Sequence, residues 1–567
     1  MSMLLALGRW AENLRLEHAP EGVQRRLRLQ AASVLGAAAE SVGAEEIAPV
    51  LAVARGMGSG PFRVAPGVNG LGLEGALMAG SALSMAHDHD DWMLCAHAGH
   101  SAVWASWLGA AELGLPWERA LTAQLAANEI SARLGGVCLA GRQNGQAWSY
   151  LHAVSGALVG GLLRGLSGRQ LAEAMGLALA QAPHVDWSLF RSGGKVLTAS
   201  RPLLDGWRLA ALVEAGVRGP VDVLEPGSDF LEVFASGRPL RGWMTGLDPA
   251  DPAASSWLTW TLSIKTVPGC AYLSTSVEAL REVRRELEEY EGHAIGAEDV
   301  LRVDVDAGLL TTAMERLLGA SGPLTPVAVT FSVRLSLAVL LLAGELTARQ
   351  LSGEWLREHE EAVRSLADRI HLHHDWRLTV ETWNAMRRSL AVDRLLAGIG
   401  PGPLLAAATR GGGLQGGLQA GLALTEVPLA MAGERIQGFD TDELPELLSR
   451  GLSRLSGLAS RGMERLMNPK PQPGPRRFDL ADHDLSTVTV PLPARVRVLL
   501  HGGHVREAEV RIARGSPGRP VLETEAATHA KLTEGLRAAG EPDPHAAADA
   551  LLVGDLPGDG PAAVVIG

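Results

Sequence analysis

The chain has 567 residues, which is too many for one hydrophobic core, so two domains are expected. Apolar residues make up 47% and charged residues 20% of the sequence, the composition of an ordinary globular protein. The net charge of -12 argues against a nucleic-acid-binding protein, which normally has a basic surface. An anionic substrate is not excluded, because a local lysine or arginine can bind it inside a cleft.

Cysteine content and hydropathy indicate the cellular compartment in which the protein is expected. Cys95, Cys138 and Cys270 are far apart and odd in number, so the sequence predicts neither a disulfide framework nor a zinc site. The N-terminus lacks the basic region and cleavage site of a signal peptide. The longest apolar stretch, residues 327–344, carries Arg334 in its middle and predicts a buried helix rather than a membrane span. We therefore expect a cytoplasmic protein.

Residues 1–254 have the pattern of an all-helical domain. Short Gly/Pro turns separate its segments, and Ala, Gly and Leu dominate residues 71–113 and 151–179. Helices of this composition are apolar nearly all round and pack closely at the centre of a bundle.

The pattern changes near Ser255 to a mixture of strands and helices. Alternation predicts strands, and 3.6-residue periodicity predicts helices. Gly502 and Gly503 predict the turn of a hairpin. The expected elements are a strand at 257–265, a helix at 275–292, a strand at 300–308, a helix at 329–344, a strand at 368–380 and a hairpin at 495–515. This order indicates an α+β domain made of residues 255–384 and 479–525, followed by a helical tail, 526–567, that returns to the first domain.

Residues 385–478 interrupt this second domain. They include the Gly-rich segment 410–421, a helix with a stripe of leucines at 444–455, and the Pro-rich linker 468–477. One interpretation is a surface insertion that packs its stripe on the host domain. The other is a contact with a partner or a membrane surface.

Residues 87–100 concentrate groups that carry chemistry. One hypothesis is a metal site, since His and Asp are good ligands, although no HExxH pattern or second cluster completes it. Another is a polar helix end with solvated charges. The third, which we favour, is an acid/base site in which a carboxylate orients a histidine. The residues are His87, Asp88, His89, Asp90, Asp91, His97 and His100.

Two further residues are weak candidates by themselves. His152 lies in an apolar Gly/Ala helix, where a lone histidine is often a satisfied core residue. Lys195 follows a Gly-Gly pair and either holds a carboxylate or is a surface charge.

The order and spacing of several motifs resemble the MmgE/PrpD family, which includes 2-methylcitrate dehydratase, cis-aconitate decarboxylase and iminodisuccinate epimerase. The resemblance covers nearly the whole chain outside 385–478. The motifs that carry it are DHDD (88–91), VWASWLGAAE (103–112), NEISARLG (128–135), QLAEAMGLALAQA (170–182), the segment after Lys195, LEPGSDFLEVF (224–234), IKTVPGC (264–270) and FSVRLSLAVLLLAG (331–344).

The resemblance implies an all-helical domain, a smaller α+β lid and an active site between them. It also implies a homodimer that needs neither a metal nor an organic cofactor. The residues carried over are Asp88, a histidine at His97 or His100, His152 and Lys195. Counting from Asp88 with the dehydratase spacing favours His100.

Departures from the family pattern bear on the substrate. Trp92 replaces a threonine, Ser274 a histidine, Val267 and Leu335 tyrosines, and Thr198 a histidine. A buried tricarboxylate needs several cationic or hydroxyl partners, so these losses favour a larger or less charged substrate, as in secondary metabolism. The substrate-binding candidates are Asp91, Trp92, Trp187, Phe190, Arg191, Ser274 and Leu335, of which the aromatic residues and Leu335 would form an apolar wall.

The sequence thus predicts a lyase (dehydratase or decarboxylase) or a related isomerase. His100 and His152 would exchange protons, Asp88 would orient, and Lys195 or Arg191 would stabilise negative charge on a carboxylate-bearing small molecule. Two alternatives remain open: an altered family member that acts as a binding or scaffold subunit, and a metal-dependent hydrolase built on residues 87–91.

Overall fold

The computed structural model describes residues 2–139, 141, 148–237, 239–318, 322–391, 394, 478–552 and 565. The chain divides into two compact units, residues 1–390 with 479–567, and residues 391–478. The expected Gly-rich segment, leucine stripe and linker of the second unit lie outside the described residues. Helix α17 (Trp376–Leu390) runs past residue 385, where the insertion was expected to start, and ends at Leu390.

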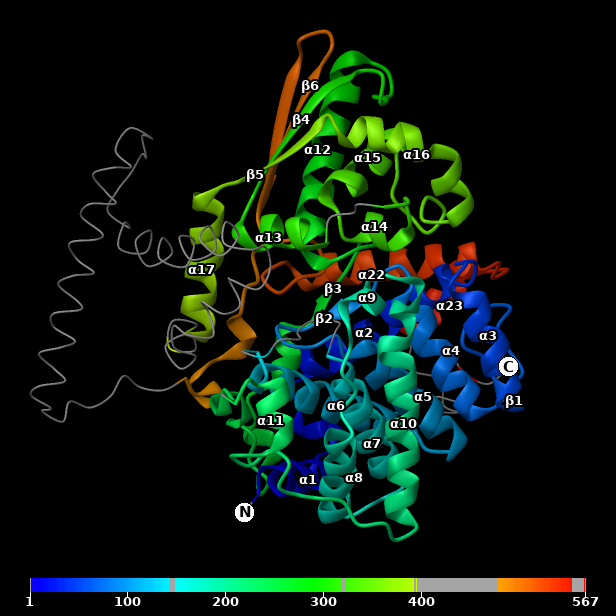
Figure 1. Cartoon of the computed structure of the whole chain (residues 1–567), viewed down its shortest axis with the longest axis vertical. Coiled ribbons are helices and arrows are strands. Elements are labelled where there is room, and N and C mark those ends of the chain that lie inside the picture. Colours follow the sequence, from blue (N-terminus) through cyan, green and yellow to red (C-terminus); the bar gives the residue numbers. More distant parts are fainter. Residues whose placement is uncertain are drawn as a thin grey trace, which may run out of the picture. The chain divides into compact units, whose positions relative to one another are not determined.

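Helices make up most of the first 254 residues (Figure 1). Short 3-10 turns occur at Leu16–His18, Gly193–Val196, Arg241–Met244 and Pro252–Ala254. The helices are α1 (Met3–Asn13), α2 (Glu21–Glu40), α3 (Ile47–Gly56), α4 (Leu73–Met85), α5 (Gly99–Glu112), α6 (Trp117–Val137), α7 (Ser149–Leu163), α8 (Gly168–Ala180), α9 (Trp187–Phe190), α10 (Leu197–Glu214) and α11 (Asp229–Phe234). The short strands described in this part are β1 (Ser59–Phe62) and β2 (Asp91–Trp92).

Glycines allow the central helices to approach closely, as the Ala/Gly-rich composition predicts. A Cβ atom at Gly156 of α7 would lie 2.2 Å from the carbonyl oxygen of Leu203 in α10. A Cβ atom at Gly206 of α10 would lie 1.9 Å from the carbonyl oxygen of Ala153 in α7. Nearly every residue of α7 is buried, so this helix lies in the middle of the bundle.

The second part of the same unit is an α+β layer. Its sheet has the strand order β5-β4-β6-β7, in which β4 and β5 are parallel and the other neighbours are antiparallel. Helix α12 packs against β6 and β7 (Figure 1). The elements are β3 (Ser263–Ile264), α12 (Ser274–Glu291), β4 (Val300–Ala307), α13 (Leu309–Leu318), α14 (Pro326–Thr330), α15 (Val333–Ala343), α16 (Gly353–Ala367), β5 (Ile370–His374), α17, β6 (Ala494–Leu500) and β7 (Val505–Val510).

The predicted alternation explains the register of this sheet. Val303 and Val305 of β4 are buried, and Val305 pairs with the buried Val496 of β6. Residues at alternate positions face the helices because side chains of a strand point to opposite faces in turn. The predicted helix at 275–292, strand at 300–308 and hairpin at 495–515 are confirmed, as is the fold class, mostly α with an α+β portion.

The strand expected at 257–265 is wrong over most of its length. Leu258–Thr261 form a 3-10 turn, and only Ser263–Ile264 are extended. The cause is the buried carboxylate of Glu129, which accepts hydrogen bonds from the N–H groups of Leu258 and Thr259 at 2.9 and 2.7 Å. These side-chain acceptors satisfy backbone donors that a strand would otherwise offer to a neighbour.

Two other expected elements are shorter than predicted. The helix at 329–344 is broken, because Ser332 lies between α14 and α15 and its hydroxyl accepts from the N–H of Leu335, which caps α15. The strand at 368–380 ends at His374. Asp375 stops it, since its carboxylate accepts from the N–H of Arg377 at 2.7 Å and α17 begins there.

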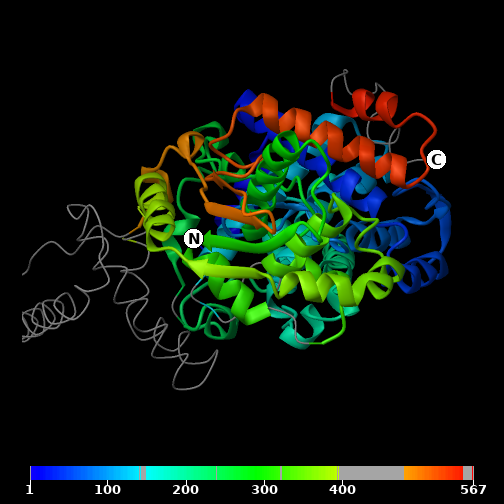
Figure 2. The same ribbon diagram turned by 90° about the horizontal axis from the view of Figure 1, so that it is seen from above.

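The C-terminal helices pack on the N-terminal part of the unit. They are α22 (Val521–Ala538) and α23 (Pro544–Leu552), and both contact α2. Figure 2 shows the red α22 running past the blue N-terminal helices. The approach of α22 to α2 is close, because a Cβ atom at Gly535 would lie 2.3 Å from the carbonyl oxygen of Gly36. Among the helices that the structure describes, none is long and apolar enough to cross a membrane.

Candidate active site

The loop between α4 and α5 carries most of the predicted site. His87, Asp88, His89 and Asp90 are all buried, as is His100 in the first turn of α5. The backbone at Asp88 has a φ of 56°, in the left-handed region that Asp tolerates better than most residues. The hypothesis of a solvated polar helix end is therefore wrong, and these charged groups need partners inside the protein.

Two lysines hold the carboxylate of Asp88. Its Oδ1 lies 2.6 Å from Lys195 Nζ, and its Oδ2 lies 3.1 Å from Lys265 Nζ. Lys265 also donates to the carbonyl oxygen of Asp88 and pairs with Asp90. Burial alone would raise the pKa of Asp88, but the charges of Lys195 and Lys265 outweigh it and hold the pKa below its usual value. Burial would lower the pKa of Lys265, but the two carboxylates raise it.

Asp90 contacts both candidate histidines of the loop. Its Oδ2 lies 2.6 Å from His97 Nδ1, in a hydrogen bond, and 3.1 Å from His100 Nε2, without hydrogen-bond alignment. His100 Nδ1 lies 3.0 Å from the hydroxyl of Ser84. Burial would raise the pKa of Asp90, but Lys265, His97 and His100 keep it well below its usual value. A carboxylate that stays ionised fixes the orientation of both rings.

His152 of α7 lies beside this group. Its ring centroid is 6.1 Å from that of His100, and its Nδ1 lies 3.0 Å from the hydroxyl of Ser101. Burial lowers the pKa of His152 well below its usual value, and positive charge on His100 and His97 adds to this, while Asp90 opposes it. His152 is therefore neutral near pH 7 and able to accept a proton. The structure thus brings Asp88, Lys195, His97, His100 and His152 into one cluster.

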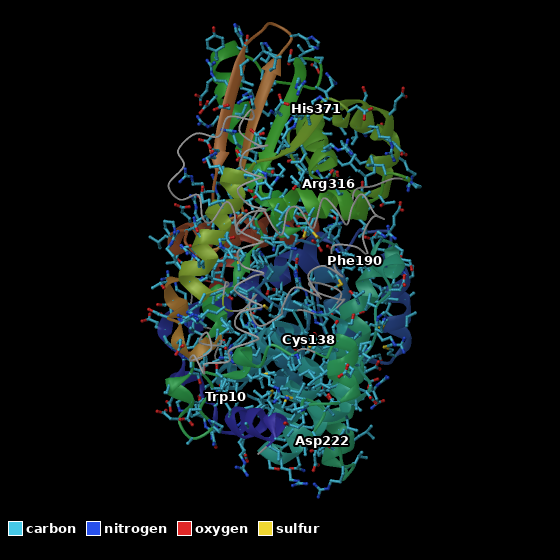
Figure 3. All side chains as sticks on the ribbon, turned by 60° about the vertical axis from the view of Figure 1, so that its left-hand side comes forward. Trp10, Cys138, Phe190, Asp222, Arg316 and His371 are labelled. Carbon is cyan, nitrogen blue, oxygen red and sulfur yellow. The ribbon has the colours of Figure 1, made fainter. Side chains whose placement is uncertain are left out.

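Aromatic rings lie against the ammonium group of Lys195. Lys195 Nζ is 5.9 Å from the ring centroid of Phe190 and 5.0 Å from that of Phe331. The two rings are 5.2 Å apart and belong to the buried core of the α+β layer. Figure 3 shows Phe190 at the level where the helical bundle meets that layer. Phe190 thus contributes apolar surface next to Lys195, and its role in binding a substrate stays a prediction.

The other predicted substrate-binding residues lie in several environments. Leu335 and Ser274 are buried, and Leu335 belongs to the same core as Phe190. Trp92 is half-buried in the short strand β2 (Asp91–Trp92), which pairs with β3. Arg191 is exposed. The side chain of Trp187 lies outside the described residues.

Asp91 belongs to a separate polar network of the helical bundle. Its Oδ2 accepts from the amide of Gln30 at 2.8 Å, and that amide also contacts Asn128. The Oδ1 of Asp91 has no hydrogen-bond partner among the described residues. Burial and then the negative charge of Asp90 raise the pKa of Asp91. Asp91 therefore differs from Asp88 and Asp90 in forming no ion pair with any residue that the structure describes.

A second charged group borders the cluster. Glu40, at the end of α2, accepts from His89 Nδ1 at 2.9 Å. Lys531 of α22 donates to the hydroxyl of Ser33 at 2.7 Å and to the carbonyl oxygens of His89 and Lys265. Burial lowers the pKa of Lys531 to about 8 and that of His89 to about 4, although Glu40 opposes both shifts. Lys531 thereby joins the C-terminal helix to the backbone on either side of the cluster.

The sequence analysis gave no role to several of these residues. Lys265 and Phe331 lie within motifs 264–270 and 331–344, so their motifs were a usable signal. Asp90 was named in the cluster 87–100 but was not singled out from its neighbours. Lys531 has no motif around it, and only the fold places it here. Among the described residues, no group of three His, Cys, Asp or Glu side chains is arranged to hold a metal ion.

A comparison with known protein families tests the resemblance to the MmgE/PrpD family. Residues 5–242 match the family model of the MmgE/PrpD N-terminal domain. This match supports membership of the chain in the MmgE/PrpD family. This MmgE/PrpD domain contains Asp88, Asp90, the three histidines and Lys195, whereas Lys265, Phe331 and Lys531 lie beyond the matched residues. A search of the curated proteins finds no match to the chain. The family is generally enzymatic, with dehydratase- and lyase-like members.

Proposed function

We propose that the protein is a lyase or a related isomerase that moves a proton at a carbon next to a carboxylate or carbonyl group. The arrangement that supports this most directly is Asp90, whose ionised carboxylate lies between His97 and His100 with His152 beside them. Proton removal at such a carbon needs a base that is unprotonated near pH 7 and a group that stabilises the negative charge that develops. This cluster offers both kinds of group.

His152 is suited to accept the proton because burial keeps it neutral at pH 7. His97 is suited to return one, since Asp90 holds its Nδ1 and its side chain is 13% exposed. The side chain of His100 is only 1% exposed and lies between Ser84 and Asp90. We therefore assign the contact with substrate to His97 and an orienting role to His100, which reverses the preference that the sequence spacing gives.

Lys195 is suited to hold the negative charge of the substrate. Lysine has three donors, and Lys195 uses two of them within the described residues, on Asp88 Oδ1 and, at 3.4 Å, on the carbonyl oxygen of Met85. Lys265 uses all three, on the carboxylate and carbonyl of Asp88 and on Asp90. A carboxylate or enolate oxygen beside Lys195 would accept the remaining proton.

Hydrogen exchange with solvent tests this proposal without knowledge of the full reaction. The full-length protein is incubated in D₂O with a series of mono-, di- and tricarboxylates that bear a hydroxyl, a double bond or an amine, and products are followed by NMR. Deuterium should enter next to a carboxylate of at least one compound. His152→Ala should slow this by roughly 10²–10⁴-fold. Lys195→Ala should mainly weaken binding or the transition state.

The control is His293→Ala, which removes a histidine from the exposed surface of the α+β layer. It should react like the original protein. Exchange that continues unchanged in both His152→Ala and Lys195→Ala would contradict the proposed mechanism. The interpretation as a binding or scaffold subunit would then replace it.

A further inference from the structure

A cleft of about 1080 Å³ borders the segment that follows Lys265. Its lining does not include the acid/base residues of the proposed function. Side chains of α12, the residues that follow α15, the end of β7 and α22 line it. Its lining also includes Glu40, His89 and Lys531. The volume is in the range of small-molecule sites.

Two arginines of this cleft lack carboxylate partners. Arg281 of α12 and Arg514, which follows β7, form no ion pair with any described residue. Burial lowers the pKa of Arg281, Glu278 opposes this, and the like charge of Arg514 adds to the lowering. The two guanidinium groups thus repel each other across the cleft. A bound anion would remove that repulsion, since arginine only donates hydrogen bonds.

The other arginines of the cleft are already paired. Arg285 pairs with Glu289 at 2.7 Å, Arg519 with Glu523 at 2.7 Å and Arg511 with Glu509 at 3.2 Å. Glu278 accepts the backbone N–H of Arg514, and burial raises the pKa of Glu278. Glu278, Glu534 and Glu345 of the cleft oppose the lowering of the pKa of Arg281, but none of them forms an ion pair with Arg281 or Arg514.

His89 supplies a second polar contact in the same cleft. Its side chain is 7% exposed, and its Nε2 is buried with no hydrogen-bond partner among the described residues. Glu40 accepts from Nδ1, so Nδ1 carries the proton and Nε2 is left as an acceptor. A buried acceptor without a donor is costly, and a ligand donor that reached it would relieve that cost.

We propose that this cleft binds a small organic anion. Its carboxylate or phosphate lies between Arg281 and Arg514, and its hydroxyl or amine donates to His89 Nε2. This binding site goes beyond the proposed acid/base function and does not depend on it. Because Lys531 bonds the carbonyl oxygens of His89 and Lys265, a ligand here lies next to the backbone that holds Asp88 and Asp90.

Isothermal titration calorimetry of the full-length protein with inorganic phosphate and with malonate tests the anion contact. Arg281→Gln and Arg514→Gln should each weaken binding of the preferred probe about tenfold or more, because each removes a charged double donor. Arg285→Gln, a paired arginine of the same cleft, is the matched control and should bind within about twofold of the original protein. Equal weakening in all three variants, or no binding of either probe, would overturn the proposal.

Further variants and probes complete the test. Arg281→Lys keeps the charge and should bind more tightly than Arg281→Gln, and circular dichroism checks that every variant is folded. Glycerol 3-phosphate should bind more tightly than phosphate, by about fivefold for one added hydrogen bond, and His89→Phe should remove that gain. Tighter binding of 1,4-diaminobutane than of both anions would overturn the proposal. His152→Ala should bind phosphate normally, so failure of the acid/base mechanism is distinguishable from failure of this site.

Discussion

Asp90 and Asp91 are adjacent, equally buried aspartates, yet replacement by asparagine should affect them in opposite ways. Asp90 faces Lys265, His97 and His100, whereas Asp91 has only the amide of Gln30. Removing one partner of a buried ion pair typically costs 3–5 kcal/mol. In the Asp90→Asn variant Lys265 still pairs with Asp88. We therefore expect the free energy of unfolding to fall by about 3 kcal/mol, near the lower end of that range.

Asp91→Asn should change the free energy of unfolding by less than about 1 kcal/mol, because it removes a charge whose pKa is already raised by burial and by Asp90. Urea denaturation of both variants at pH 7 measures the difference. The pH dependence gives a second check. The pKa of Asp90 is depressed in the folded protein, so its contribution exists above its unfolded value of about 3.9 and disappears as the pH falls through that value and below.

The gap between the original protein and Asp90→Asn should therefore stay nearly constant from pH 7 to about pH 5 and shrink only as the pH falls through about 4. The shift for Asp91 has the opposite sign, so its charge opposes folding at pH 7 and that penalty is relieved on acidification. Equal destabilisation by the two substitutions at pH 7 would refute the assignment of Asp90 to the cationic cluster. So would a gap for Asp90→Asn that widens at low pH.

Further expected outcomes concern packing, acid/base roles and assembly. Gly206→Ala should destabilise by about 1–3 kcal/mol or more because its Cβ would lie 1.9 Å from a backbone oxygen, whereas Gly56→Ala, with no atom within 4 Å, should be neutral or slightly stabilising in thermal unfolding. If His152 is the base, turnover should persist as the pH falls through 6.5, because its pKa is well below that value; an acid limb at 6.5 or above would exclude it. His97→Asn should reduce turnover more than His100→Asn if His97 contacts the substrate, and the reverse order would restore the preference for His100. Light scattering after size exclusion should give the mass of a homodimer, and a monomer would contradict the expectation that the family resemblance carries.

Regular periodicity was the most reliable guide to the fold. The amphipathic pattern of 275–292 and the alternation of 300–308 both arise from burial of one face, so they predict α12 and β4. Alternation at 257–265 and 368–380 misleads because single side chains override it. Glu129 captures the N–H groups of Leu258 and Thr259, and Asp375 caps the helix that replaces the second half of a strand. Such long-range or local acceptors leave no periodic signal.

The candidate site was predictable only in part, for a similar reason. Asp88, His152 and Lys195 could be chosen because motif order supports them. Asp90 could not be separated from Asp91 by sequence, since their difference lies in which cations the fold brings to each. Lys531 enters from a helix more than 400 residues further along the chain, so its contact with the carbonyl oxygen of His89 depends wholly on how α22 packs on α2.

The charge balance of the cluster limits what it can bind. Asp88 and Asp90 neutralise Lys195 and Lys265, and Lys265 has no donor left over. Among the described residues, the partners of Lys195 thus leave one of its protons for a substrate. Phe190 and Phe331 lie beside this ammonium group. One carboxylate can be satisfied there, whereas each additional buried carboxylate without a partner would cost several kcal/mol. The apolar replacements at Trp92 and Leu335 act in the same direction. The geometry therefore favours a substrate with one carboxylate or carbonyl at the reacting centre and an apolar remainder over a tricarboxylate.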